Sequence, residues 1–172
     1  MGYHTDFSGE FSLNTPLTPE HKAYLEAFNR SRRMVRDPNQ TAELQDPVRK
    51  AAGLPLGPES AYFVGTADAN FGQDRTLDIL DYNRPPKGQP GLWCQWVPND
   101  LGDTIEWDGG EKFYSYVDWI RYLLENFLKP WGYVLNGEVE WFGEESDDRG
   151  KIVITDNQVK IHEAVISWRE VD

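Results

Sequence analysis

Seven apolar side chains recur at helical spacing between residues 111 and 129, and this stripe constrains the fold more than any other feature of the sequence. From the first member, the others follow at i+3, i+4, i+7, i+11, i+14 and i+15, as on one face of a helix. The members are Phe113, Tyr116, Val117, Ile120, Leu124, Phe127 and Leu128. Pro130 and Gly132 then end the pattern. The stripe therefore predicts a helix of about five turns with one buried face.

Segments with the two-residue period of half-buried strands lie on both sides of this helix. The predicted strands are residues 3–13, 92–97, 104–107, 133–142, 151–155 and 158–168. Asp156 and Asn157 separate the last two, and both residue types tolerate the positive φ of a tight turn. The final three strands are therefore expected to be antiparallel neighbours.

A second, N-terminal helix is expected after the first strand. Thr18 is a suitable N-cap, Pro19 follows at the first helical position, and Leu25 with Phe28 continues an apolar stripe toward Arg33. Residues 37–90 then contain seven of the 11 prolines and only short apolar runs. This segment is expected to be a long irregular insertion.

The predicted order is strand, helix, insertion, two strands, helix and three strands, in a chain of 172 residues. Two helices on one face of a mainly antiparallel sheet would bury both apolar stripes. The sequence thus predicts a single α+β domain that resembles a split β-α-β arrangement with extra C-terminal strands and the insertion at about 37–90. All seven Trp residues lie at position 93 or later, so the core is expected there.

The chain is strongly acidic, with 17 Lys and Arg residues against 29 Asp and Glu residues and a formal net charge of -12. Such a charge disfavours direct binding to nucleic acid or to an anionic membrane. The sequence contains no apolar run of membrane-spanning length, and its first residues lack the pattern of a signal peptide. A cytoplasmic protein is expected.

The densest functional candidate is a run of six carboxylates in eleven residues. Its members are Glu138, Glu140, Glu144, Glu145, Asp147 and Asp148. Alternating Glu residues on an antiparallel strand are typical of its water-facing side. The same run is also compatible with a charge-mimicking surface for a basic partner, a pair of catalytic carboxylates, or a divalent cation site. No other residues complete an active site.

Four arginines, Arg30, Arg32, Arg33 and Arg36, crowd the end of the first predicted helix. Positive charge there complements the helix dipole without any ligand. Four arginines in seven residues exceed what a helix end requires, so an anion pocket or pairing with the acidic strand is an alternative. The candidate contacts of such a ligand site are Arg32, Arg33, Trp93 and Trp96.

The remaining reactive side chains form no recognisable catalytic or metal motif. Cys94 is the single cysteine and lies in an apolar strand, which favours a buried thiol over a nucleophile. His4, His21 and His162 lie on three separate elements without zinc-ligand spacing. No glycine pattern matches a phosphate-binding loop. The sequence therefore predicts neither a metal nor a cofactor.

Five segments resemble a family of small bacterial and bacteriophage proteins without an assigned function. They are GYHTDFSGEFSLNTPL, PGLWCQWV, WDGGEKFY, GYVLNGEVEW and GKIVITDN. The resemblance covers most of the chain outside the insertion and implies a phage or prophage context, with no catalytic residues to transfer. Small acidic phage proteins are often antagonists of host defence or DNA-processing proteins.

These observations favour a non-enzymatic acidic protein that binds a basic surface of a host protein through residues 138–148. The alternative is a small-ligand, nucleotide-like binding protein or an enzyme with a pocket under the insertion. A deep pocket with convergent polar groups would favour the alternative, whereas an open acidic surface would favour the first hypothesis.

Overall fold

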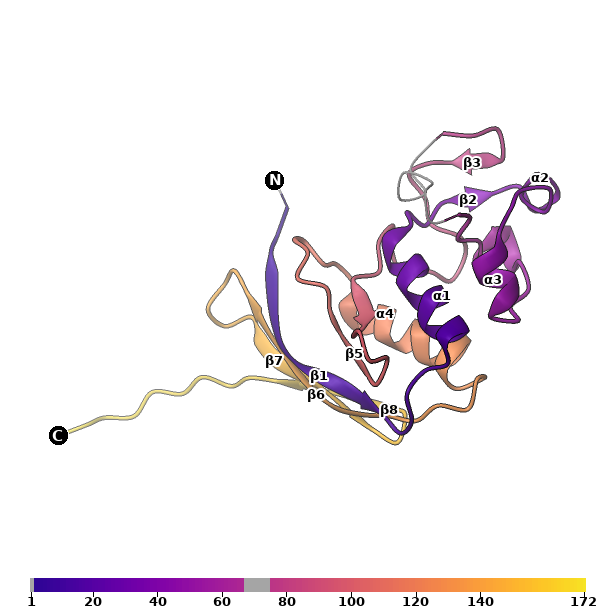
Figure 1. The fold of residues 1–172 in the computed structure, drawn as a ribbon. Coiled ribbons are helices and arrows are strands. Elements are labelled where there is room, and N and C mark those ends of the chain that lie inside the picture. The colour runs from indigo at the N-terminus through magenta and orange to yellow at the C-terminus, as the bar shows by residue number, and fades with distance from the viewer. Residues whose placement is uncertain (1, 67–74) are drawn as a thin grey trace.

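A computed structural model describes residues 2–66 and 75–172 of the chain. The main strands are β1 (Thr5–Leu13), β4 (Trp96–Pro98), β5 (Thr104–Trp107), β6 (Leu135–Gly143), β7 (Arg149–Thr155) and β8 (Gln158–Glu163). They form one antiparallel sheet in the order β4-β5-β1-β6-β7-β8. Helices α1 (Pro19–Arg30) and α4 (Tyr116–Leu123) lie on the same side of this sheet (Figure 1). The predicted α+β class is therefore confirmed.

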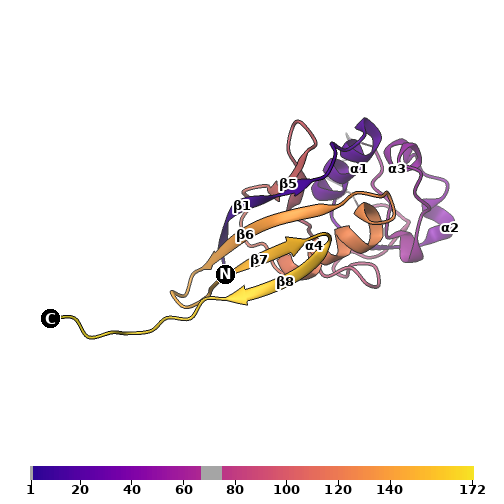
Figure 2. The ribbon, with the colours of Figure 1, turned by 90° about the horizontal axis from the view of Figure 1, so that it is seen from below.

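The segment β5-α4-β6 forms the predicted split β-α-β unit. Strand β1 pairs antiparallel with both β5 and β6, so β5 and β6 run parallel to each other with β1 between them. Strands β7 and β8 then extend the sheet beyond β6 (Figure 2). Asp156 and Asn157 form the turn between them with φ values of 48° and 67°, as their sequence predicts.

Five members of the long apolar stripe are buried and the other two, Tyr116 and Val117, are half-buried against the core, but the helix is shorter and less regular than predicted. Ser115 has a left-handed φ of 55°, so α4 begins only at Tyr116. The chain then continues as a π-helical segment, η3 (Leu124–Leu128), in which Lys129 N donates to Leu124 O at 2.9 Å. Trp119 of α4 does not belong to this stripe but is also fully buried, because its ring packs against Phe28 of α1 with 5.8 Å between the ring centroids.

Helix α1 begins where the sequence predicts. Thr18 Oγ1 accepts a hydrogen bond from His21 N at 3.2 Å, and Pro19 occupies the first turn. Tyr24, Leu25 and Phe28 are buried against α4 and η3. Across residues 2–66 and 75–172, none of the helices is both long and apolar enough to cross a membrane.

Of the predicted insertion, residues 67–74 lie outside the described residues, and residues 37–66 and 75–90 contain more regular structure than their composition indicates. They form α2 (Pro38–Thr41), α3 (Pro47–Ala51), the 3-10 turn η1 (Pro58–Ser60) and β3 (Ile79–Asp81), which pairs with β2 (Val35–Arg36). Each of the three short helices has a proline in its first turn, where the missing N–H is not needed. Three of the seven prolines of this segment, Pro38, Pro47 and Pro58, therefore lie at helix starts.

Four strands begin later or end earlier than predicted, and two of them, β1 and β6, begin at Thr5 and Leu135 instead of residues 3 and 133. The strand expected at 92–97 is confined to β4, and the last strand ends at Glu163 instead of continuing to 168. Ala164 N still donates to Arg149 O at 2.8 Å, but Arg149 is the first residue of β7. After Ala164 the chain therefore has no strand of this sheet to pair with, and residues 165–172 project from the body (Figures 1 and 2).

Candidate functional site

The predicted acidic strand is β6, and two of its carboxylates lie on the outer face of the sheet. Val139 and Trp141 of this strand are buried on the side of the helices. Because side chains alternate along a strand, Glu138 and Glu140 point to the opposite side, where both are exposed. Figure 2 shows β6 and its neighbours in front of α4, with this outer face open.

Two carboxylates from strands distant in the sequence extend this surface. Glu10 of β1 lies directly opposite Glu138. On the other side of β1, Phe11 pairs with Ile105 of β5, and the next residue beyond this pair on each strand, Glu10 and Glu106, lies on the outer face. We call Glu10, Glu106, Glu138 and Glu140 the acidic face. The alternation of each strand places Glu10 and Glu106 on a polar face. Only the position of β1 between β5 and β6 brings these two residues next to Glu138.

Like charges directly opposite each other destabilise a sheet, so the acidic face carries a cost. We expect Glu10→Gln, which keeps the size of the side chain, to raise the free energy of unfolding by about 0.2–1 kcal/mol. Urea denaturation at low salt measures the gain, which should shrink in about 1 M salt, where the screening length is roughly 3 Å. Glu43→Gln, at an exposed site away from the face, is the matched control. A less stable Glu10→Gln variant would contradict the repulsion.

The outer face becomes basic on β7 and β8. Lys151 lies opposite Glu140, and its Nζ is 3.6 Å from Glu138 Oε2. Both partners are exposed, so this ion pair contributes little stability. Further positive or titratable side chains on the same face are Arg149, Lys160 and His162. The outer face is thus divided between an acidic half on β5, β1 and β6 and a basic half on β7 and β8.

The four carboxylates of the β6–β7 turn do not act as one free acidic group. Asp148 accepts hydrogen bonds from Tyr3 Oη at 2.7 Å and from Trp141 Nε1 at 3.0 Å. Glu144 Oε1 accepts a hydrogen bond from the backbone N–H of His4 at 2.6 Å. Asp148 and Glu144 therefore hold the turn against the first residues of the chain. The side chains of Glu145 and Asp147 are exposed.

Three of the four arginines at the end of α1, Arg32, Arg33 and Arg36, interact with the insertion. Arg33 is fully buried, and its guanidinium donates to Ser31 Oγ at 3.2 Å and to the carbonyl of Phe63. Burial lowers the pKa of Arg33. Arg36 forms a buried ion pair with Asp78 at 2.7 Å. Arg33 therefore anchors the segment at Phe63 and Arg36 anchors the segment at Asp78, and neither arginine pairs with the acidic strand.

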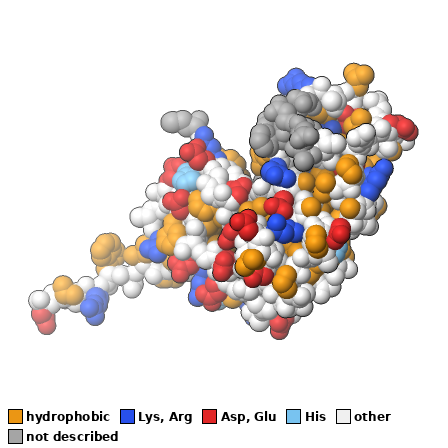
Figure 3. All heavy atoms as spheres, in the orientation of Figure 1, with side chains coloured by type: hydrophobic (Ala, Val, Ile, Leu, Met, Phe, Trp, Pro, Cys, Tyr) orange, Lys and Arg blue, Asp and Glu red, His pale blue; other side chains and the backbone are white. Residues whose placement is uncertain are grey.

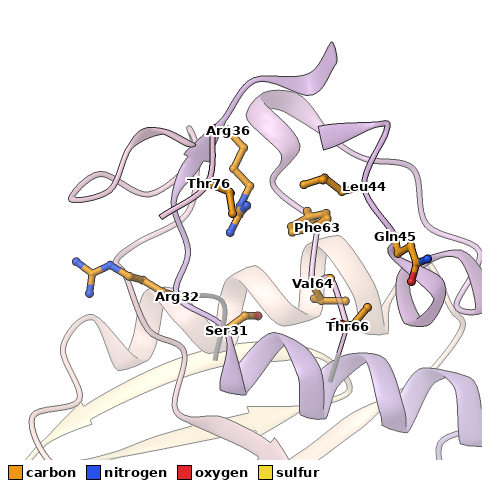
Figure 4. Close-up of a pocket in the computed structure, with 10 residues that line it drawn as sticks. Ser31, Arg32, Arg36, Leu44, Gln45, Phe63, Val64, Thr66 and Thr76 are labelled. Atoms are coloured by element: carbon orange, nitrogen blue, oxygen red, sulfur yellow. The ribbon is translucent and has the colours of Figure 1, made fainter. Parts of the chain in front are cut away.

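A pocket of about 240 Å³ lies between the end of α1, β2 and the insertion. Figure 4 shows the guanidinium of Arg36 beside Thr76 and pointing into this space, with Phe63 across from it, whereas the guanidinium of Arg32 points away from the other lining residues. The apolar part of the lining includes Leu44 and Val64. No motif in the sequence indicates the contribution of Phe63 or Thr76.

Of the four residues predicted for a ligand site, Arg32 alone lines this pocket. Its guanidinium binds Tyr82 O at 3.0 Å and lies 4.2 Å from the Tyr82 ring. Arg33 does not line the pocket, although it bonds Ser31 and Phe63, which do. Trp96 is in the core, where its Nε1 donates to Tyr116 O at 2.9 Å, and Trp93 is half-buried.

Cys94 is buried, and burial raises the pKa of its thiol to about 12. The thiol therefore stays protonated and shielded at ordinary pH. We expect native protein at pH 8 to react with a disulfide reagent such as Ellman's at least 100-fold more slowly than urea-unfolded protein, because the thiolate is the nucleophile. Absorbance at 412 nm measures both rates. Equal rates would contradict the buried position.

The histidines do not converge. His4 is 2.9 Å from Asp6, His21 stacks on Trp131 at 3.8 Å, and His162 is exposed. Burial lowers the pKa of His21. In the part of the chain that the structure describes, no group of three or more His, Cys, Asp or Glu side chains is arranged to hold a metal ion.

Comparison with known proteins returned no match: no protein-family model, no curated protein and no solved structure is significantly similar to this chain. Arguments about its function therefore start from its own geometry.

Proposed function

We propose that this chain is a non-enzymatic binding protein whose acidic face engages a basic surface of a partner protein. The observation that carries the proposal is the row formed by Glu106, Glu10 and Glu138 on three neighbouring strands. Such a row costs folding free energy. A binding role accounts for its presence, since a basic partner would neutralise the repulsion on contact.

The surroundings of the row suit contact with long basic side chains. Ser8 and Ser12 of β1 lie on the same face as Glu10, so small side chains flank the carboxylates. The exposed Glu145 and Asp147 add charge at one end of β6. Clustered charge of one sign raises the association rate with an oppositely charged partner by roughly 10 to 1000-fold. The proposed role of the acidic face is therefore fast capture.

The resemblance to bacteriophage proteins supports a host protein as the partner, and we place the interaction in the cytoplasm. Defence and DNA-processing proteins present basic surfaces that bind phosphates, and a row of carboxylates competes for the same surface. In this proposal the chain itself contacts neither nucleic acid nor membrane, because its net charge is -12.

The test compares three immobilised proteins in a bacterial lysate. The face variant carries Glu10→Gln, Glu106→Gln and Glu140→Gln, and it leaves Glu138 with Lys151. The control removes three exposed charges elsewhere, through Glu43→Gln, Asp100→Asn and Glu111→Gln. We expect basic proteins that elute with salt to be captured by the native chain and the control, and to associate with the face variant at least 10-fold more slowly. Equal capture by all three proteins would refute the proposal.

A further variant separates the sheet from the turn. Glu145→Gln with Asp147→Asn removes the exposed charges of the turn and leaves the bonded Glu144 and Asp148 in place. Slower association of this variant with the captured partner would show that the contact extends beyond the acidic face. Unchanged association would confine the contact to the sheet.

The pocket beside Arg36 supports a second candidate function, the binding of a small anionic, nucleotide-like ligand. The specific observation is that the Arg36 guanidinium, which pairs with Asp78 through one nitrogen, points into the pocket, while buried Arg33 bonds Ser31 and Phe63 of its wall. Titration with adenosine monophosphate, followed by the melting temperature, tests this candidate. Leu44→Glu at the pocket lining should abolish any stabilisation. No stabilisation of the native chain at millimolar ligand would exclude this candidate.

A further inference from the structure

The projecting residues 165–172 carry four large apolar side chains within seven residues. The exposed fractions are 91% for Val165, 56% for Ile166, 95% for Trp168 and 73% for Val171. Figure 3 shows hydrophobic and charged side chains following each other along this tail. Single exposed apolar residues are ordinary, whereas such a concentration marks a segment that binds another surface.

The tail continues from the open edge of the sheet. The two edge strands differ: β4 has three residues and ends in Pro98, which has no N–H to donate, whereas β8 has six residues and no proline. All six residues of β8 pair in regular register with β7. No bulge or covering segment within the described residues interrupts the free edge of β8, so it can accept a further strand.

A hollow of about 420 Å³ lies beside the first residues of β8. Leu124 and Val159 provide apolar surface in its lining. Arg121, Lys129 and Lys160 provide positive charge, of which Lys129 is paired with Glu125 of the same lining. The tail is apolar with a small excess of negative charge, since Arg169, Glu170 and Asp172 follow or flank its exposed apolar residues. The space is sufficient for an indole side chain.

We propose that two copies of this chain pair through β8 in an antiparallel, two-fold arrangement, and that the tail of each copy occupies the hollow of the other. Antiparallel pairing of identical strands places the end of one β8 beside the start of its partner. The tail leaves the end of β8, and the hollow lies at its start. Each tail is thereby carried to the partner's hollow.

The tail does not reach the hollow of its own chain. The six residues of β8 separate the two by about 20 Å. A tail that folded back would first need a turn, and Trp168 would then reach only the middle of β8. The pairing involves the edge of the sheet and leaves the acidic face of both copies open. It therefore goes beyond the proposed function, and a test of the pairing does not depend on whether the acidic face binds a partner.

Sedimentation of the full chain between 1 and 100 µM tests the pairing. We expect a species of twice the 19.8 kDa of one chain. Val165→Ser with Trp168→Ser should weaken the dimer at least 10-fold, because buried Trp residues dominate interface affinity. This variant should fold normally, since both side chains are exposed within one chain. Leu77→Ser with Leu101→Ser removes equally exposed apolar side chains elsewhere and should leave the dimer unchanged.

Crosslinking tests the tail exchange directly. Arg169→Cys with Gln158→Cys keeps Trp168 and should give a covalent dimer with a short bismaleimide, and Arg169→Cys with Leu101→Cys should not. A chain that sediments as a monomer up to 100 µM would overturn the proposal. The proposal would be overturned equally if the tail of such a monomer bound another protein. A dimer that is unaffected by the tail variant would overturn it as well.

Discussion

Ile120→Asp is expected to unfold the domain. Ile120 lies at the centre of the α4 stripe and is fully buried in the core. An unpaired carboxylate there costs several kcal/mol, and the lost apolar contacts add to this cost. Domains of this kind have a stability of only about 5–15 kcal/mol. Far-UV circular dichroism during heating should show no cooperative transition, or one at least 20 °C below that of the native chain.

Two substitutions control for this result. Ile120→Val keeps the apolar face and should cost about 0.5–1.5 kcal/mol. Arg121→Asp adds the same carboxylate one residue further along the helix, where the side chain is exposed, and should leave the fold intact. A cooperative melt of Ile120→Asp near the native temperature would contradict the assignment of the buried face.

The success of that stripe as a prediction has a physical basis. A helix or strand must bury one face, so its apolar residues recur at the period of that element and can be recognised in the local sequence. The same holds for the alternation in β6 and for the Asp156-Asn157 turn, whose positive φ values suit these residue types. The start of α4 was mispredicted because Ser115 adopts a left-handed conformation, which periodicity does not reveal.

The acidic face was only half predictable, because it depends on strand pairing. Glu138 and Glu140 share a strand, and their alternation shows in the sequence. Glu10 and Glu106 join them only because β1 inserts between β5 and β6. The sequence likewise gives no sign that Asp148 and Glu144 are held by Tyr3 and His4, more than 100 residues away. Long-range contacts therefore change which carboxylates of the predicted run are free to bind a partner.

The buried contacts of the predicted insertion, residues 37–90, could not be predicted from the sequence either. Its prolines and glycines indicated an irregular segment, yet one buried side chain organises much of it. Asp46 Oδ1 accepts the backbone N–H groups of Val64 at 3.2 Å and Gly65 at 2.9 Å, while Oδ2 is paired with Arg49. These bonds join α3 to the pocket wall. A single Asp before a proline resembles any other helix cap in the sequence.

Asp46→Asn is therefore expected to cost about 3–5 kcal/mol, as does the loss of one partner from a buried ion pair. The substitution leaves the charge of the mostly buried Arg49 without its carboxylate and places an amide group where Asp46 has only acceptors. Asp37→Asn is the matched control, because Asp37 caps α2 at a more exposed site. It should cost about 1 kcal/mol or less. Urea denaturation measures both values.

The location of the damage should follow the contacts of Asp46. Hydrogen exchange of the Val64 and Gly65 amides should accelerate at least 100-fold in Asp46→Asn. Exchange of the Ile152 amide in β7 should accelerate only by the factor that corresponds to the loss in the global free energy of unfolding. Adding Arg49→Met to Asp46→Asn should recover part of the stability, because no unpaired buried charge then remains. If Asp46→Asn costs no more than Asp37→Asn, or if Arg49→Met gives no recovery, the ion pair does not organise the insertion. The pocket wall would then depend on Arg33 and Arg36 instead.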